Sequence, residues 1–212
     1  RTNYLTYGNE TDNFNQPHYQ LHNVYEINDK TTLSNTLYYI RGKGYYEQLK
    51  PSASYADYNI RPEQLNIDPD TGEPYESGDI ARQIWVAKNQ YGWNPRLDIE
   101  HAAGRHTLGG SFYYFSSDHW GQVIFAENLH GSLEPGNRFY QYFGDKYVGS
   151  VYAQEQYNLT PKLGMLATAQ VRFQRYTFDQ VKMGAFKGYD YDLDWFFFSP
   201  RLGFTYELTP SV

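Results

Sequence analysis

Apolar and polar residues alternate along several stretches of the chain, and alternation with a period of two predicts β-strands that have one apolar face. The clearest stretch is residues 198–208, where every second residue from Phe198 to Leu208 is apolar or aromatic. The alternation recurs at residues 163–174 and 93–99, whereas no window of about 20 residues has a helical period. The chain is therefore predicted to be all-β.

The connections between the predicted strands alternate between short and long. Links of hairpin size at residues 28–30, 103–105 and 158–162 contain turn-forming residues such as Asn, Asp, Gly and Pro. Segments of roughly 45, 30 and 20 residues, rich in Tyr, Gly, Asp and Asn, follow the three hairpins in turn and are interpreted as long loops. This asymmetry is typical of an up-and-down meander in an outer-membrane barrel. About seven strands are counted, with residues 3–7 as a candidate eighth. Six of them form the three hairpins, at residues 18–27 with 31–39, 93–102 with 106–115, and 146–157 with 163–175.

Aromatic residues make up 19% of the 212 residues, and 23 residues are Tyr, well above ordinary globular usage. A Tyr ring can lie in an apolar layer while its hydroxyl stays in water, so tyrosines collect where a membrane meets water. Tyr25 and Tyr157 stand next to short turns and are predicted to form a lower girdle. An upper girdle is predicted where strands enter the long loops, at Tyr39, Tyr114, Phe115 and Tyr147.

The register of the first hairpin is left open by the sequence, because Asn23 and Asn35 fall on its predicted lipid face.

Composition and charge exclude several classes of protein. A mean hydropathy of −0.75 excludes a bundle of transmembrane helices. It does not exclude a membrane β-barrel, whose strands interleave apolar with polar residues. The net charge of −6 argues against nucleic-acid binding, and the absence of Cys excludes disulfides and thiolate metal sites. The chain begins at Arg1 without an apolar leader, so a targeting segment is expected to lie outside it or to have been removed.

Several segments resemble recurrent pieces of one family of membrane barrels. Residues 198–210, FSPRLGFTYELTP, resemble a strand of TonB-dependent outer-membrane receptors that leads through a turn into the next strand. Residues 151–160, VYAQEQYNLT, are similar to the family hairpin Y-A-Q-(D/E)-x-(W/Y)-x-L-T. Residues 41–48, RGKGYYEQ, and 118–123, DHWGQV, are similar to the same group. The order and spacing of these motifs make the chain resemble the β-barrel portion of siderophore- and cobalamin-type receptors.

The resemblance implies an antiparallel up-and-down transmembrane β-barrel of 22 strands, in which residues 1–212 form a partial wall of about seven or eight strands. The plug domain and the remaining strands would lie outside this chain. The implied function is active uptake of a large, scarce nutrient across the bacterial outer membrane, a ferric siderophore first and cobalamin next. The TonB complex would act through the plug. Outer-membrane lipid and lipopolysaccharide are further implied partners, a surface lipoprotein over the barrel stays open, and no cofactor is expected.

Other architectures and functions fit parts of the pattern. A closed eight-stranded barrel agrees with the strand count. A passive porin-like channel would share the wall but lack the plug, and a soluble, aromatic-rich β-sandwich that binds carbohydrate would also show alternating strands. An enzyme is not expected, because no nucleophile motif is present. The carboxylate pair Asp98 and Glu100 shares a predicted strand face with Arg96, which favours two ionised groups over a glycosidase pair.

Two sets of residues are predicted to carry the function. Rigid aromatic rings suit the capture of a large, flat or chelated ligand. The ligand-contact candidates in the predicted outward-facing loops are Trp120, Phe125, Phe139, Tyr140, Tyr142, Tyr189, Tyr191 and Trp195. The polar strand faces are predicted to line a lumen against which a plug can pack, through Arg96, Asp98, Glu100, Gln170, Arg172, Arg201 and Glu207.

No metal site is predicted. His18 and His22 share a strand face but stand about 13 Å apart, too far for one ion. His101 and His106 flank the turn at residues 103–105 and could meet across it, yet an interfacial role is favoured for both. The acidic segment 68–73 lacks the ligand ladder and distal Glu of an EF-hand calcium loop, so a solvated loop is favoured there. This segment and residues 190–194 could bind divalent ions that bridge lipopolysaccharide, but their spacing does not require it.

Overall fold

A computed structural model describes residues 8, 11–131, 137–183 and 188–208. In these residues eight β-strands and two short 3₁₀ helices, η1 (Tyr55–Tyr58) and η2 (Pro62–Gln64), follow one another along the chain. The all-β prediction is confirmed. The strands are β1 (Asp12–Asn15), β2 (His18–Asn28), β3 (Thr31–Ser54), β4 (Ser77–His101), β5 (Gly104–Ala126), β6 (Arg138–Thr160), β7 (Leu163–Met183) and β8 (Asp190–Tyr206).

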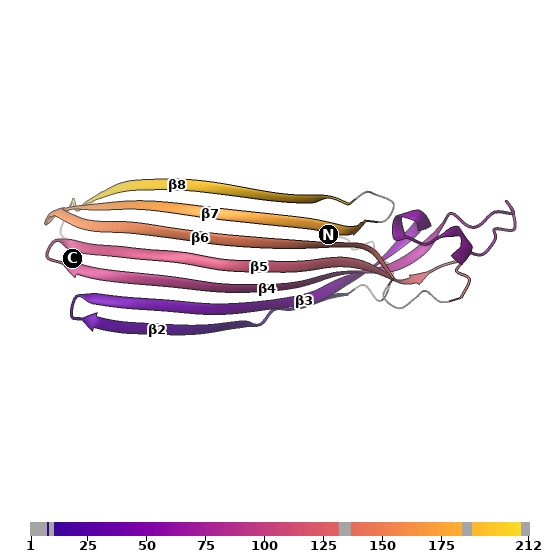
Figure 1. Cartoon of the computed structure of the whole chain (residues 1–212), viewed down its shortest axis with the longest axis horizontal. Helices are drawn as coiled ribbons and strands as arrows, with labels where there is room; N and C mark the ends of the chain where they lie inside the picture. Colours follow the sequence, from indigo (N-terminus) through magenta and orange to yellow (C-terminus); the bar gives the residue numbers. More distant parts are fainter. Residues whose placement is uncertain (1–7, 9–10, 132–136, 184–187, 209–212) are drawn as a thin grey trace.

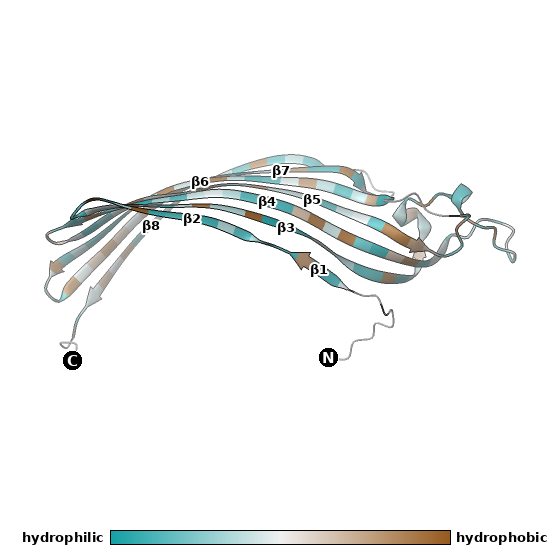
Figure 2. Ribbon diagram, turned by 90° about the horizontal axis from the view of Figure 1, so that it is seen from below, coloured by the Kyte–Doolittle hydropathy of each residue, from teal (hydrophilic) through white to brown (hydrophobic). Residues whose placement is uncertain are grey.

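The strands form one antiparallel sheet, in which β3 to β8 lie side by side in chain order (Figure 1). β1 and β2 both pair with β3, with β2 along residues 31–40 and β1 along residues 43–46. The sheet has eight strands but is seven strands wide, because β1 and β2 follow one another along the same edge of β3. The candidate strand at residues 3–7 lies outside the described residues. The sheet is open at both edges and curves as an arch (Figure 2), which is the predicted partial wall.

The short turns were predicted correctly, but the long loops were not. Residues 29–30, 102–103 and 161–162 connect the hairpins at one end of the sheet, named the turn end. At the other end, named the loop end, most of the residues interpreted as loops continue the strands: β4 alone has 25 residues. The connections left at the loop end are residues 55–76, 127–137 and 184–189. The strands reach this far because nearly all their residues pair with a residue of a neighbouring strand.

The cross-strand register separates a polar face from an apolar face. Asp98, Thr107, Gln154, Thr168 and Arg201 are partners across five successive strands, so their side chains point to the same side. The neighbouring row is apolar, and successive residues of a strand point to opposite faces. The two rows therefore define the two faces of the wall. The apolar row consists of Leu33, Leu97, Leu108, Ala153, Ala169 and Pro200.

A row of five tyrosines crosses the apolar face where the polar residues of the loop end begin. Tyr39 and Tyr91 stack with ring centroids 4.7 Å apart, and Tyr114 and Tyr147 lie at the same distance. Phe115 was predicted to join this row but pairs with Gln90 on the polar face, because it is one residue out of phase. The five tyrosines are cross-strand partners in one register from β2 to β6. We call them the tyrosine row: Tyr19, Tyr39, Tyr91, Tyr114 and Tyr147.

The open register of the first hairpin is resolved by its pairing. Asn23 pairs with Asn35, and both lie on the apolar face. The side-chain oxygen of Asn35 accepts a hydrogen bond of 3.1 Å from the indole N–H of Trp93. This bond satisfies a polar group that would otherwise be costly on an apolar face.

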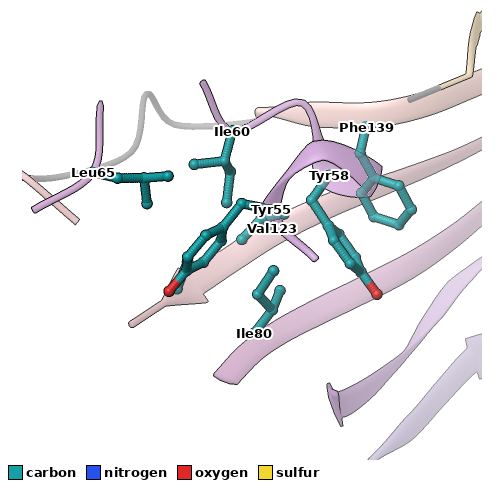
Figure 3. Packing of buried hydrophobic residues seen from close by; sticks show 8 residues of the cluster. Tyr55, Tyr58, Ile60, Leu65, Ile80, Val123 and Phe139 are labelled. Atoms are coloured by element: carbon teal, nitrogen blue, oxygen red, sulfur yellow. The ribbon is translucent and has the colours of Figure 1, made fainter. Parts of the chain in front are cut away.

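The connection between β3 and β4 builds a small hydrophobic core at the loop end. Tyr55 and Ile80 are almost completely buried, at 1% and 0% exposure. In Figure 3, Tyr58 of η1 lies beside Phe139 of β6, and their ring centroids are 4.7 Å apart. We call this cluster of buried residues the loop core: Tyr55, Tyr58, Ile60, Leu65, Ile80, Val123, Ala126 and Phe139.

In the described part of the chain, no helix has the length and apolar character needed to cross a membrane.

Candidate functional site

An ion-paired network lies on the polar face of the hairpin β4–β5. The guanidinium of Arg96 donates two hydrogen bonds to the carboxylate of Asp98, with N–O distances of 2.7 and 2.9 Å. The hydroxyl of Thr107, which is buried, donates a third hydrogen bond of 2.7 Å to the same carboxylate. Asp98 is therefore held by two neighbouring strands, through charge-assisted hydrogen bonds that are stronger than neutral ones.

Aromatic rings gather on the same polar face nearer the loop end. The ring of Tyr142 stacks on His119, with centroids 4.6 Å apart and an interplanar angle of 10°. On its other side Tyr142 contacts Phe178 at 5.1 Å, and Phe178 stacks on Tyr191 at 4.9 Å. We call the rings of strand residues connected in this way the aromatic cluster: His119, Phe139, Tyr140, Tyr142, Tyr176, Phe178 and Tyr191.

Burial changes the acid–base chemistry of this cluster, which lies beyond the tyrosine row. Desolvation raises the pKa of the Tyr140 and Tyr142 hydroxyls further above neutral pH, so both stay protonated and can donate hydrogen bonds even in moderately basic solution. Desolvation also lowers the pKa of His119, and nearby Lys88 adds to this effect while Asp118 opposes it. The cluster therefore offers flat, uncharged rings with hydroxyl and imidazole groups that can donate hydrogen bonds.

Four of the eight predicted ligand-contact residues belong to the aromatic cluster: Phe139, Tyr140, Tyr142 and Tyr191. These residues lie on strands, not in loops as predicted, because β6 and β8 extend to the loop end. Alternation along β6 and β8 places Tyr140, Tyr142 and Tyr191 on one face. The irregularity in pairing beside Gly121 brings the ring of the adjacent Phe139 against Tyr140.

The other four ligand-contact candidates lie elsewhere. Trp120 is on the opposite face, where its ring stacks on Trp85 at 5.4 Å and Arg138 lies over it. Phe125 is near the end of β5 and is 54% exposed, and Tyr189 precedes β8 and is 70% exposed. Trp195 pairs with Gln174 on the polar face, but no ring contact joins it to the cluster among the described residues.

Sequence reasoning missed three members of the aromatic cluster: His119, Tyr176 and Phe178. Tyr176 and Phe178 stand two residues apart and continue the polar-face phase of Gln170, Arg172 and Gln174 on β7. That phase could have identified them if the strand had not been ended at residue 175.

Six of the seven residues predicted to line a lumen lie on the polar face. Arg96, Gln170 and Arg172 share that face with Asp98, Glu100 and Arg201 by register. At the turn end, Glu100 pairs with Arg105, whose guanidinium donates to its carboxylate. Glu207 lies just past β8. Whether this face borders a lumen stays a prediction.

The segments considered for metal binding differ in their contacts. His22 contacts Thr36 and Gln20 through its two ring nitrogens, and Asp68 accepts a hydrogen bond from the backbone of Asp70 within a tight turn. Asp192 pairs with Arg175. In the part of the chain that the structure describes, one group of three metal-ligand side chains converges, at His101, His106 and Glu155.

Comparison with known structures gives the fold a context. The crystal structure of the ferric-catecholate import receptor Fiu from E. coli K12 in its closed form is similar to 98% of this chain, with 12% sequence identity and a TM-score of 0.51. The open form of that receptor gives 14% identity over 94% of the chain and a TM-score of 0.47. This chain covers 32% and 34% of those two chains, about a third of their length.

Comparison with sequence families is more specific. No curated protein matches the chain. A family model described as TonB dependent receptor-like, beta-barrel matches residues 1–212, which is the entire chain. This match agrees with the open antiparallel meander and with the resemblance carried by residues 151–160 and 198–210. The chain belongs to the TonB-dependent receptor β-barrel family.

Proposed function

We propose that this chain is part of the wall of an outer-membrane receptor that takes up a large, scarce nutrient in a TonB-dependent manner, a ferric siderophore first and cobalamin next. The observation that carries the proposal is the aromatic cluster around Tyr142, on the polar face of a wall whose opposite face is apolar. Family membership supports the mode of transport. The convergence of rings supports a ligand site.

The apolar face fits the height of the apolar band expected of an outer-membrane barrel. Tyr91 in the tyrosine row and His101 at the turn end are ten positions apart on β4, which is about 33 Å along a strand at 3.3 Å per residue. A strand tilt of about 40° reduces this to about 25 Å, the height of the apolar band of outer-membrane barrels. The ring of Tyr157 stacks on that of His101, with centroids 5.9 Å apart. This aromatic pair supports a second membrane–water boundary at the turn end.

The polar face suits contact with a plug domain. Near the turn end its residues include polar side chains that are hydrogen-bonded to each other, as Arg96, Asp98 and Thr107 are. A plug packed on such a face would make wet, polar contacts, so it could shift without exposing apolar surface. The TonB complex would drive that shift through the plug, and the wall itself would do no catalysis.

The aromatic cluster suits a ligand with flat rings. Tyr142 is only partly buried, and Tyr191 is 41% exposed, so the cluster presents ring surface and does not close on itself. Aromatic side chains bind flat groups with little loss of conformational entropy. Ferric catecholates carry such rings, and the similar fold of a ferric-catecholate import receptor makes them the first ligands to test.

The full-length receptor should be expressed in a Gram-negative strain that lacks its own siderophore and cobalamin receptors. Growth would be measured on a ferric catecholate, a ferric hydroxamate or cobalamin, with and without a functional TonB complex. TonB-dependent growth on one class supports the proposal and names the ligand. Growth that persists without TonB supports a passive channel instead, and no uptake of any class contradicts the proposed nutrients.

A matched pair of variants tests the site itself. Tyr142→Ala removes the central ring of the cluster, and we expect ligand affinity to fall about tenfold or more. Phe143→Ala removes the adjacent ring, which is 38% exposed and points to the opposite face. Its affinity is expected to stay near that of the unmodified receptor. Equal affinities of both variants and the unmodified receptor would place the ligand away from the cluster.

A further inference from the structure

Two histidines and a glutamate meet at the turn end of the apolar face. His101 is the last residue of β4, His106 follows the turn on β5, and Glu155 pairs with His106 across β5 and β6. The two imidazole rings stack with centroids 4.5 Å apart. Three side chains from three adjacent strands are thus brought to one point.

The donor atoms of these side chains face one another. Nε2 of His101 lies 3.0 Å from Oε1 of Glu155, and Nδ1 of His106 contacts Oε2 of the same carboxylate. One ligand atom from each residue lies within 4.8 Å of the others. In a tetrahedral zinc site with bonds of about 2.0–2.2 Å, neighbouring donor atoms are about 3.3–3.5 Å apart. Small side-chain movements would therefore bring all three within bonding distance of one ion.

The chemistry of the three donors suits a borderline metal ion. Imidazole nitrogens and one carboxylate are ligands of zinc and of other late first-row divalent ions. Nε2 of His101 and the carboxylate of Glu155 share a hydrogen bond, and a metal ion would replace its proton. The backbone N–H of Ala103 approaches Nδ1 of His101 at 3.3 Å. Coordination through Nε2 would move the ring proton to Nδ1, so this long hydrogen bond would be exchanged for the metal bond.

We propose that His101, His106 and Glu155 form a binding site for a divalent transition-metal ion such as Zn²⁺, on the outer rim of the barrel at its turn end. Water would complete the coordination. His106 is 55% exposed, and His101 and Glu155 are 26% and 24% exposed, so an ion can reach all three donors. A bound ion would link β4, β5 and β6 at the rim. The site is separate from the aromatic cluster and does not depend on which nutrient is transported.

The test uses the full-length receptor, purified in detergent, with Co²⁺ and Zn²⁺ as the probes. Co²⁺ bound to nitrogen and oxygen donors in a four-coordinate site gives visible absorption bands, which report the geometry directly. His106→Gln and Glu155→Gln each remove one donor, and we expect at least a tenfold weaker affinity for one equivalent of Zn²⁺. His22→Gln removes an exposed histidine from β2 and is expected to leave the affinity for this equivalent of Zn²⁺ unchanged.

Two results would overturn the proposal. One is an unchanged Zn²⁺ stoichiometry and affinity in both His106→Gln and Glu155→Gln. The other is X-ray absorption at the zinc edge of the unmodified receptor that shows no imidazole ligands. The second measurement needs no variant, so it decides the question even if a substituted receptor fails to fold. A rise in melting temperature with Zn²⁺, present in the unmodified receptor and absent in His106→Gln, is the expected supporting result.

Discussion

The hydroxyl of Tyr55 donates a 2.6 Å hydrogen bond to the backbone carbonyl of Glu127, joining the connection after β3 to the residue that follows β5. Tyr55 is 1% exposed, so this bond is shielded from water. A Cβ atom on Gly78 would stand 2.1 Å from the same hydroxyl. The second residue of β4 must therefore be a glycine for residues 55–76 to pack on the sheet as they do.

Gly78→Ala is expected to loosen the loop core. The added methyl group cannot share space with the Tyr55 hydroxyl, and overpacking of this kind costs about 1–3 kcal/mol. Hydrogen exchange should become faster in residues 55–65, while the middle of β4 keeps its protection. Gly203→Ala is the control, because a Cβ atom there would meet nothing within 4 Å. Equal exchange in both variants would contradict the steric role of Gly78.

A new charge should destabilise the apolar face of the wall much more than the polar face. Val151 is 49% exposed on the apolar face between the tyrosine row and the turn end. In a bilayer, Val151→Arg is expected to destabilise the folded receptor by about 2–4 kcal/mol. Gln170→Arg, on the polar face of the adjacent strand, should change stability by less than about 1 kcal/mol. Reversible unfolding in lipid vesicles measures both, and equal losses would show that the apolar face does not contact lipid.

Much of the fold could be predicted because its physical cause is local. Alternation along residues 93–99 and 163–174 marks strands, and Asn, Gly and Pro mark the turns between them. The lengths of the strands depend instead on pairing between distant residues. Tyr45 and Trp85 illustrate this, because their rings contact at 4.4 Å across strands that the sequence alone suggested were loops.

The candidate site was harder to predict for the same reason. His119 and Trp120 are adjacent in the chain, yet His119 joins the aromatic cluster and Trp120 stacks on the opposite face. One residue of register decides between these faces, and irregularities such as the one between Gly121 and Gln122 shift it locally. Composition alone can therefore show that aromatic residues are abundant, but not which of them meet.

His119 should make the stability of the receptor depend on pH. Burial lowers its pKa in the folded protein, so the unfolded chain, in which His titrates near pH 6.5, binds the proton more readily. Its contribution to stability is complete above about pH 6.5 and is lost as the pH falls below that value. His119→Gln is expected to lose less stability than the unmodified receptor between about pH 7.5 and 5. His22→Gln, which replaces an exposed ring, controls for the general loss of a histidine.

Arg82 connects the loop core to the sheet, and two variants can separate its charge from its packing. Its guanidinium donates hydrogen bonds of 3.2 Å to the Tyr58 hydroxyl and to the side-chain oxygen of Gln48, while its Nε is buried without a partner among the described residues. Arg82→Met removes both hydrogen bonds and also removes this unsatisfied donor, while it keeps an apolar stem against Tyr58. Arg82→Ala removes the stem as well, which leaves a cavity.

We expect Arg82→Ala to cost about 2–3 kcal/mol of unfolding free energy and Arg82→Met about 1 kcal/mol or less. The difference arises because Arg82→Ala also removes the stem and leaves a cavity. In both variants, removal of the unpartnered buried Nε offsets part of the loss of the two hydrogen bonds. Unfolding of the full receptor in detergent, followed by tyrosine and tryptophan fluorescence, compares the two variants. If Arg82→Met were as damaging as Arg82→Ala, the hydrogen bonds to Tyr58 and Gln48 would account for the contribution of Arg82, and packing of the stem would contribute little.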